Sequence, residues 1–246
     1  METNDWTQNY FDEVYRRLFL ETVDPARTAY QVRGLLRMCP LLPGASVLDV
    51  GCGVGRHGLA LAGLGFHVIG IDSNPDYILE CRNRAAAQGV SADFFAMDSR
   101  TMSLDRRVDL AISLWSSFGY YGETGDVQVL ERIADHLRSG GRLVIDVENR
   151  DYIVKHFVPQ EWHEHGDEVV LESRRFDPIN GTVSTRRVVV SGVERHEYRR
   201  VLRMYTGNEL SVLLRRAGLR IERWYGDYDG SRLGSDSRRM IAVAVR

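Results

Sequence analysis

The sequence predicts an α/β fold: a doubly wound, mostly parallel sheet of seven strands with an inserted three-stranded antiparallel β sheet. Strands alternate with helical segments of about 10–14 residues, a pattern typical of βαβ units. After Glu148 the pattern changes to strand-like segments joined by hairpin turn signals. The chain has 246 residues, of which 43% are hydrophobic, so it can bury a core without disulfides or metals.

The first 40 residues are expected to be helical. Aromatic and aliphatic side chains recur at helical spacing between Trp6 and Leu20. Pro25 interrupts this helix. A second amphipathic helix is expected to run to about Met38.

The next part of the chain predicts the parallel sheet. The expected strands cover residues 46–50, 67–71, 92–96, 108–114 and 142–147. The helices between them cover residues 55–64, 75–88 and 126–137. Right-handed crossovers should place these helices on both faces of the sheet.

The last part of the chain predicts the insertion and the sheet edge. The inserted strands cover residues 168–176, 183–190 and 193–204. Thr206 begins a helix, with Glu209 as its capping-box partner, and the helix ends at Gly218. Strands 219–225 and 240–245 then form a hairpin. The expected domains are 1–40, 41–160 with 205–246, and the insertion 161–204.

Composition disfavours several classes of protein. The net charge of −2 lacks the basic bias of a protein that binds nucleic-acid backbones. No apolar run reaches the roughly 18 residues of a membrane span, and the N-terminus does not read as a secretory signal. Cys39, Cys52 and Cys81 match neither a zinc nor a redox motif. We therefore expect a cytoplasmic protein without a metal site.

A glycine-rich turn, Gly51 to Gly55, follows the first strand. Its glycines allow a tight turn and a close approach to a ligand. It lies at the carboxyl end of the strand, where doubly wound sheets bind ligands. Arg56 stands where the dinucleotide fingerprint needs glycine, and the P-loop motif is absent. Asp49 favours a ligand that carries positive charge.

The ends of the next three strands also carry polar or aromatic residues. Asp72 ends the second strand, where a carboxylate can accept hydrogen bonds from both ribose hydroxyls. Asp98 and Ser99 follow the third strand and would reach an adenine amino group. Residues 114–121 follow the fourth strand and offer aromatic walls and hydroxyls to a substrate.

These motifs resemble those of the class I S-adenosylmethionine-dependent methyltransferases. Residues 49–57 are similar to the Asp-x-Gly-Cys-Gly-x-Gly-Arg-His loop of a small-molecule group in that superfamily. Further similar segments are 117–120, 146–151, 205–210 and 225–231. The resemblance runs from about Tyr10 to Arg246. It implies a Rossmann-like fold, S-adenosylmethionine as cofactor, a small-molecule substrate, an N-terminal helical lid and a β cap.

The resemblance also implies the role of each site residue. The glycines would line the methionine end, Asp49 would hold its ammonium, Asp72 the ribose, and Asp98 the adenine. The candidate cofactor-binding residues are Asp49, Gly51, Cys52, Gly53, Gly55, Asp72, Ser73, Asp98, Ser99 and Leu114. The candidates beside the reacting groups are Tyr15, Trp115, Tyr120 and Glu148. The alternative is core packing for these aromatic residues and a surface position for Glu148. His57 is expected to pack rather than to catalyse.

The implied reaction is methyl transfer by in-line displacement to a nitrogen, oxygen or carbon atom of a small molecule. Alignment of the reacting atoms supplies most of the acceleration, and a general base is optional for an amine. Three alternatives stay open: a nucleobase methyltransferase, a protein that binds the cofactor without methyl transfer, and a nicotinamide dehydrogenase. Residues 113–116 lack the Asn/Asp-Pro-Pro-aromatic motif of nucleobase methyltransferases that act on exocyclic amines. A monomer or a homodimer is expected.

Overall fold

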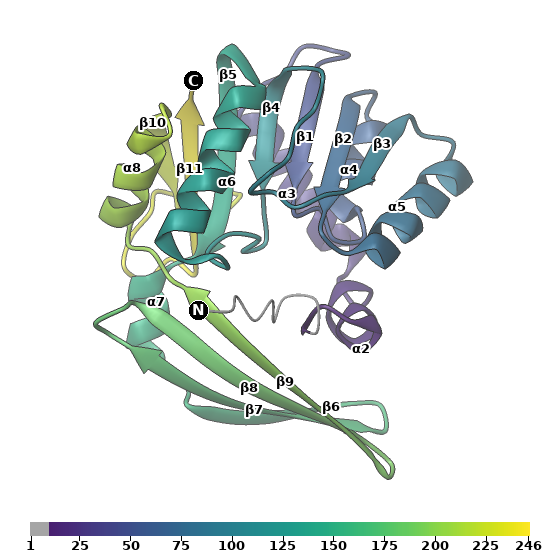
Figure 1. Ribbon diagram of the computed structural model, residues 1–246, viewed down its shortest axis with the longest axis vertical. Coiled ribbons are helices and arrows are strands. Elements are labelled where there is room, and N and C mark those ends of the chain that lie inside the picture. Colours follow the sequence, from purple (N-terminus) through teal and green to yellow (C-terminus); the bar gives the residue numbers. More distant parts are fainter. Residues whose placement is uncertain (1–9) are drawn as a thin grey trace.

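Two separate β sheets form the framework of the computed structural model, which describes residues 10–246 (Figure 1). The larger sheet has seven strands in the order β10-β11-β5-β4-β1-β2-β3. Its strands are β1 (Ser46–Val50), β2 (His67–Asp72), β3 (Ala92–Ala96), β4 (Val108–Ser113), β5 (Leu137–Glu148), β10 (Arg220–Tyr225) and β11 (Arg239–Val245). β1 to β5 are parallel, and β11 runs antiparallel to β5 and β10. The predicted seven-stranded α/β fold is confirmed.

Helices cover both faces of this sheet, as the right-handed crossovers require. They are α3 (Pro25–Met38), α4 (Arg56–Gly63), α5 (Pro75–Gln88), α6 (Gly122–His136) and α8 (Gly207–Arg216). One apolar cluster packs α6 and α8 against one face, and a second packs α3 and α4 against the other. The buried strand residues Leu48 and Ile112 belong to opposite clusters. This core fixes the carboxyl ends of β1, β2 and β4 relative to one another.

The smaller sheet is an antiparallel meander of four strands, so the prediction of three strands is wrong. Its strands are β6 (Gln160–His165), β7 (Glu168–Asp177), β8 (Thr182–Ser191) and β9 (Glu194–Arg203). β6 was not predicted because none of its residues is buried, and Trp162 keeps 65% of its surface exposed. Backbone pairing with β7 holds β6 in the sheet. The expected domain boundaries at residues 40, 160 and 204 stay predictions.

The smaller sheet lies beyond the carboxyl ends of the parallel strands of the larger one (Figure 1). The chain enters it after α7 (Arg150–Lys155) and leaves it just before α8. Between the two sheets runs the N-terminal segment, residues 10–20. Arg17 pairs with Glu168 of the smaller sheet, and Asn74 of the larger part donates its amide N–H to Phe11 O (2.7 Å). The segment therefore contacts both sheets.

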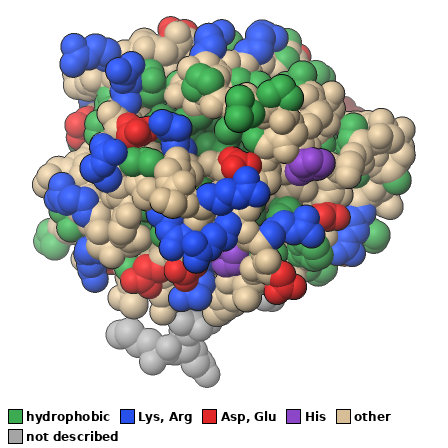
Figure 2. Space-filling view, turned by 90° about the horizontal axis from the view of Figure 1, so that it is seen from above, with side chains coloured by type: hydrophobic (Ala, Val, Ile, Leu, Met, Phe, Trp, Pro, Cys, Tyr) green, Lys and Arg blue, Asp and Glu red, His purple; other side chains and the backbone are tan. Residues whose placement is uncertain are grey.

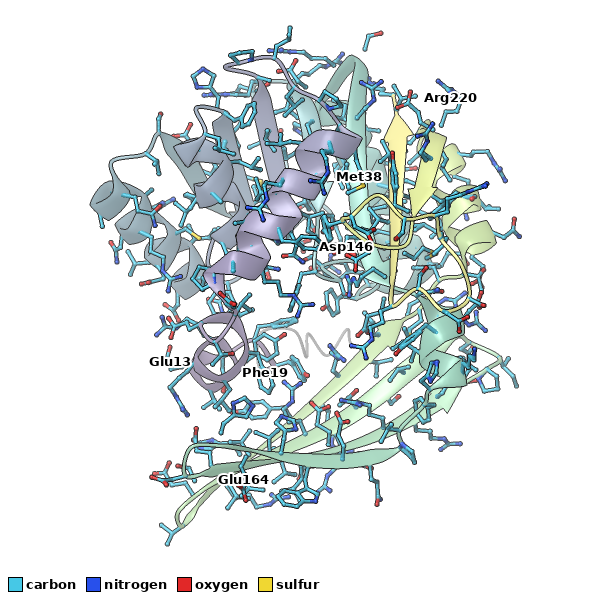
Figure 3. The ribbon with its side chains drawn as sticks, turned by 180° about the vertical axis from the view of Figure 1, so that it is seen from behind. Glu13, Phe19, Met38, Asp146, Glu164 and Arg220 are labelled. Carbon is cyan, nitrogen blue, oxygen red and sulfur yellow. The ribbon has the colours of Figure 1, made fainter. Side chains whose placement is uncertain are left out.

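This N-terminal segment is not the regular α-helix expected from Trp6 to Leu20. It contains α2 (Glu13–Tyr15) followed by a π-helical turn, η1 (Arg16–Leu20), and residues 6–9 lie outside the described range. Glu13 and Phe19 lie on opposite sides of the segment (Figure 3). Phe19 packs into an apolar cluster with the smaller sheet. No helix among residues 10–246 has the length and hydropathy to cross a bilayer.

Candidate functional site

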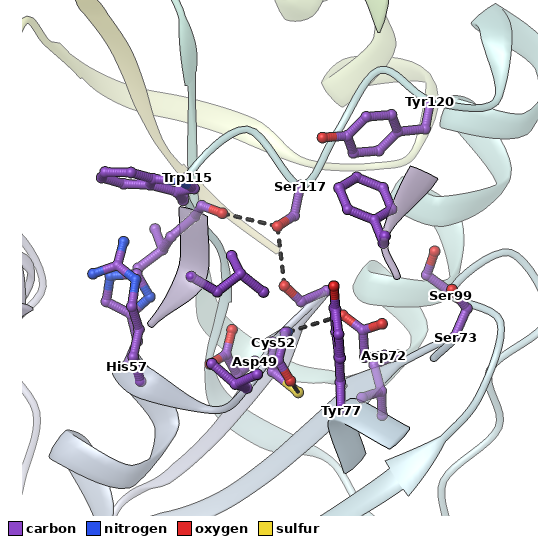
Figure 4. A pocket seen from close by; sticks show the side chains of 18 of the residues that line it. Asp49, Cys52, His57, Asp72, Ser73, Tyr77, Ser99, Trp115, Ser117 and Tyr120 are labelled. Carbon is purple, nitrogen blue, oxygen red and sulfur yellow. Dashed lines mark hydrogen bonds between the residues drawn. The ribbon is translucent and has the colours of Figure 1, made fainter. Parts of the chain in front are cut away.

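A pocket opens between the carboxyl ends of β1, β2 and β4 and the N-terminal segment (Figure 4). It holds about 960 Å³ of atom-free space, counting its open mouth, which is in the range of small-molecule and cofactor sites. Side chains from the loops after these strands form its floor. Aromatic residues of the N-terminal segment and of the loop after β4 form a wall.

The glycine-rich turn has a left-handed backbone at each of its three glycines, Gly51, Gly53 and Gly55 (φ +71°, +55° and +78°). A Cβ atom at Gly51 would lie 2.7 Å from Ser117 Cβ, and one at Gly55 would lie 2.9 Å from Cys81 Sγ. At Gly53 the nearest atom would be 3.8 Å away. Gly51 and Gly55 therefore satisfy packing, whereas Gly53 leaves open space for a ligand.

Asp72 ties this turn to the end of β2. Its Oδ2 accepts the backbone N–H of Gly53 (2.9 Å), and its Oδ1 accepts the backbone N–H of Asn74 (3.0 Å). Burial raises the pKa of this carboxyl group above its ordinary value, while the backbone N–H groups of Asn74, Gly53 and Ser73 oppose the shift. Both oxygens lie against the pocket floor, where they can accept further hydrogen bonds from a ligand.

Asp49 is the most deeply buried carboxylate of the pocket, with 2% of its surface exposed. Burial raises its pKa to about 7, and the nearby Arg56 charge opposes that shift. The backbone N–H of Gly58, in α4, also opposes the shift. Oδ2 has no side-chain hydrogen-bond partner among the described residues. A cationic group of a ligand near Asp49 would favour its charged form.

The loop after β4 is strained where it reaches the pocket. Trp115 and Ser116 both have φ of 61°, which is uncommon for residues other than glycine. The hydroxyl of Ser117 lies within hydrogen-bond distance of the carbonyl oxygens of Gly51 (3.0 Å) and Leu114 (2.9 Å). This contact joins the loop to the glycine-rich turn and places the Leu114 carbonyl group at the pocket.

The aromatic wall is built from Phe11, Tyr15 and Tyr120. The Phe11 ring makes edge-to-face contacts with the rings of Tyr15 and Tyr120, with ring centroids 4.9 Å and 5.6 Å apart. Burial raises the pKa of Tyr15 to about 12 and raises the pKa of Tyr120 as well. Both phenols are therefore protonated at neutral pH. They can donate hydrogen bonds to a substrate but are poor general bases.

Most of the predicted site residues converge on this one pocket. The lining includes Tyr15, Asp49, Gly51, Cys52, Gly53, Asp72, Ser73, Ser99, Leu114, Trp115 and Tyr120. Three predicted residues do not line it: Gly55 is the N-cap of α4, Asp98 pairs with Arg100 (2.6 Å), and Glu148 borders a separate small cavity. Arg100 lowers the pKa of Asp98. Their roles toward a ligand stay predictions.

Several residues of the pocket were not predicted from the sequence. They are Phe11, Leu20, Val54, Arg56, His57, Ile71, Tyr77 and Met97. Ser117 and Tyr121 also line the pocket and belong to residues 114–121, which are expected to face a substrate. In the sequence, Arg56 is a departure from the dinucleotide fingerprint and a member of the motif at residues 49–57. Its position directly after the glycine-rich turn was the available signal. Tyr77 lies within α5 and gave no signal, because its helical spacing is that of a core residue.

Residues 47–141 match the sequence model of a family described as methyltransferase domain. The matched residues include β1 to β4 and the glycine-rich turn, so this part of the chain is similar to methyltransferase domains. A relative from Geobacillus sp. (strain WCH70) is 32% identical over 102 residues, which are 41% of this chain and 41% of the relative. The cypemycin N-terminal methyltransferase of Streptomyces sp. is 25% identical over 221 residues, covering 83% of this chain and 84% of its own.

Solved structures show the same fold over nearly the whole chain. An S-adenosylmethionine-dependent methyltransferase from Clostridium acetobutylicum ATCC 824 superposes with a TM-score of 0.82 at 17% identity, covering 94% of this chain and 96% of its own. The S-adenosylmethionine-bound amino pentose methyltransferase CalS10 of Micromonospora echinaspora has a TM-score of 0.66 at 21% identity, covering 96% and 98%. Both sheets therefore belong to an arrangement that known methyltransferases share.

Proposed function

We propose that this protein is an S-adenosylmethionine-dependent methyltransferase that acts on a nitrogen, oxygen or carbon atom of a small molecule. The observation that carries the proposal is the buried carboxylate of Asp49 beside the open glycine-rich turn. A pyrophosphate would be repelled by this carboxylate, whereas the ammonium of a methionine derivative would pair with it. Asp72, at the end of the neighbouring strand, can then accept hydrogen bonds from the ribose hydroxyls.

The residues of the pocket fit the parts of this cofactor in order. The turn at Gly51 and Gly53 would lie against the methionine end, and Asp72 would accept the ribose hydroxyls. Met97 and Ser99, which follow β3, would contact the adenine. Asp98 is proposed to read the adenine amino group, although its carboxylate is already paired with Arg100. The pocket volume of about 960 Å³ leaves room beside the cofactor for a small acceptor, next to the wall of Phe11, Tyr15 and Tyr120.

When bound, S-adenosylmethionine supplies a methyl group on a sulfonium that needs no further activation. The protein must then position an acceptor and exclude water. Phe11, Tyr15 and Tyr120 cover the pocket on the side of the N-terminal segment. The protonated hydroxyls of the two tyrosines can orient a polar acceptor. A neutral amine would need no base at the transfer step, whereas a hydroxyl or carbon acid would need one.

Methylation of nucleic acid is less well supported as an alternative. The net charge is −2. On the face in Figure 2, acidic side chains lie among the basic ones. Ion pairs such as Arg138–Asp109 and Arg142–Glu222 neutralise some of the arginines. A continuous basic surface is the usual electrostatic footprint of a nucleic-acid-binding protein.

Calorimetric titration with S-adenosylmethionine and S-adenosylhomocysteine tests the cofactor assignment. Micromolar binding of both is expected, and a screen of amines, hydroxylated compounds and RNA for methyl transfer would follow. Binding without transfer to any acceptor would favour the alternative of a regulatory cofactor-binding protein. Absence of binding to either compound would contradict the proposal. The same samples, run by sedimentation, would distinguish the predicted monomer from the homodimer.

A further inference from the structure

One face of the smaller sheet carries a cation with which no described carboxylate pairs. On this face Arg187 of β8 packs on the Phe19 ring (4.0 Å from Cζ to the ring centroid), and its Nε donates to Glu172 (2.6 Å). Arg200 of β9 lies on the same face, because it pairs with Thr185, two residues before Arg187 on β8. Among the described residues Arg200 forms no ion pair, and neither its Nε nor the Thr185 hydroxyl has a hydrogen-bond partner. The two arginines therefore differ in whether a carboxylate neutralises them.

Arg200 lies next to the aromatic wall of the pocket. Its Cζ is 5.5 Å from the ring centroid of Tyr10, and the Tyr10 ring centroid is 5.3 Å from that of Tyr15. Burial raises the pKa values of Tyr15 and Tyr120, and the charge of Arg200 opposes both shifts. The carboxylate of Glu148 also interacts with Arg200 but lies beyond ion-pair distance. Arg200 is therefore a neighbour of residues that line the pocket, without lining it itself.

A charge that burial removes from water ordinarily has a partner of opposite sign. The Nε of Arg200 is enclosed, but the side chain as a whole is only half-buried, so its Nη groups remain within reach of a ligand. We propose that Arg200 binds a carboxylate or phosphate group of the methyl acceptor, which would lie between the aromatic wall and β9. A guanidinium can bind either oxyanion through two parallel N–H bonds. The inference rests on the proposed function and specifies its substrate class, an acceptor that carries an anionic group.

The test uses two anionic probes and one uncharged probe of similar size: benzoate, phenyl phosphate and benzamide. Each is titrated by calorimetry into protein saturated with S-adenosylhomocysteine, so that the cofactor site is filled. The wild-type protein should bind at least one anion about tenfold more tightly than benzamide, and the tighter anion distinguishes carboxylate from phosphate. Arg200→Gln and Arg200→Met should each reduce this preference to within about threefold. Arg200→Lys should keep part of it, because lysine retains the charge without the planar fork.

Arg199 provides a matched control. It adjoins Arg200 on β9, but its side chain points to the opposite face of the sheet, where it pairs with Glu197 (3.1 Å). Arg199→Gln changes the net charge equally and should keep the wild-type preference. S-adenosylhomocysteine should bind Arg200→Gln as tightly as wild type, because Arg200 is outside the pocket lining.

The inference is overturned if the wild-type protein prefers neither anion, or if both Arg200→Gln and Arg200→Met keep the preference. An equal loss of S-adenosylhomocysteine affinity in these variants would also overturn it, because Arg200 would then only support the fold around the pocket. Failure of the wild-type protein to bind S-adenosylhomocysteine would contradict the proposed function, and this inference with it. Cofactor binding without any preference for an anion would contradict this inference alone.

Discussion

The carboxylate of Asp146 accepts the backbone N–H of Trp115 across 3.1 Å, from the neighbouring strand β5. The same carboxylate accepts the hydroxyl of Tyr228 (2.9 Å) and Nε of Arg239 (2.7 Å). Asp146 is fully buried, and its backbone carbonyl accepts the N–H of Ser116 (3.0 Å). One residue thus anchors both left-handed positions of the loop after β4. Its position beside the strand ends is visible in Figure 3.

Neutralising Asp146 should destabilise the protein strongly. Asp146→Asn would leave Arg239 in a buried site without its counter-charge, and breaking such a pair costs about 3–5 kcal/mol of unfolding free energy. Denaturant unfolding measures this loss. Glu222→Gln is the matched control, because its pair with Arg142 is partly exposed and should contribute at most about 1 kcal/mol. Equal effects of the two substitutions would contradict the anchoring role.

Adding a methyl group at Gly53 should weaken cofactor binding and leave the protein folded. The new Cβ would project into open pocket space, 3.8 Å from Leu20 Cδ1. We expect S-adenosylhomocysteine affinity to fall by about tenfold or more in Gly53→Ala. Gly65→Ala shares the left-handed backbone strain but lies in open space. It should lose similar stability, about 1 kcal/mol, without a change in affinity. Unchanged binding by Gly53→Ala would remove the turn from the site.

Ligand binding should release a proton near pH 6. The pKa of Asp49 is about 7 in the ligand-free protein, so the carboxyl is mostly protonated at pH 6. An adjacent ammonium would lower that pKa. Calorimetry with S-adenosylhomocysteine in buffers of different ionisation enthalpy should show the release at pH 6 and little at pH 8.5. Asp49→Asn should abolish the release at pH 6, and a persistent release in that variant would contradict the pairing.

The same raised pKa predicts how Asp49 affects stability without ligand. The folded protein binds the proton more tightly than the unfolded chain, so the contribution of Asp49 is fully present below about pH 4 and is lost as the pH rises through 7. Asp49→Asn should therefore raise the melting temperature more at pH 8 than at pH 4. A shift of equal size at both values would indicate an ordinary carboxylate.

Ligand binding should protect the N-terminal segment from proteolysis. Tyr15 and Leu20 line the pocket, and the Tyr198 hydroxyl of the smaller sheet donates to Asp12 Oδ2 (2.8 Å). A ligand in contact with this segment should slow tryptic cleavage after Arg16 and Arg17. Cleavage at Lys155, the single lysine of the sequence, serves as control because Lys155 lies on α7 away from the pocket. Equal tryptic rates with and without ligand would argue against a lid.

The larger sheet could be predicted because its signals are local. β1, β2 and β4 are apolar runs that end in aspartate, serine or glycine, and the glycine-rich turn identifies where a ligand approaches. The pocket floor follows from these strand ends. The same reasoning located Asp49 and Asp72, because parallel strands bring their carboxyl ends to one edge of the sheet.

The remaining features depend on contacts between distant residues. β6 has no buried side chain and forms only through its pairing with β7. The π-helical turn at residues 16–20 has an amphipathic sequence that also suits a regular helix. The pairing of Asp98 with Arg100 is a choice of side-chain rotamer. The position of the Arg56 guanidinium depends on contacts with Gln31 and Trp115, which are distant from it in the sequence.

The insertion point of the smaller sheet has a consequence for how this protein can diverge. In the sequence, β5 precedes the smaller sheet and β11 follows it, and the two strands pair with each other at seven positions. Among the described residues, no strand of one sheet pairs with a strand of the other. Residues 160–203 can therefore change in sequence or length while every backbone hydrogen bond of the larger sheet is kept. Selection can therefore reshape the smaller sheet while the strand ends that form the pocket floor are inherited unchanged.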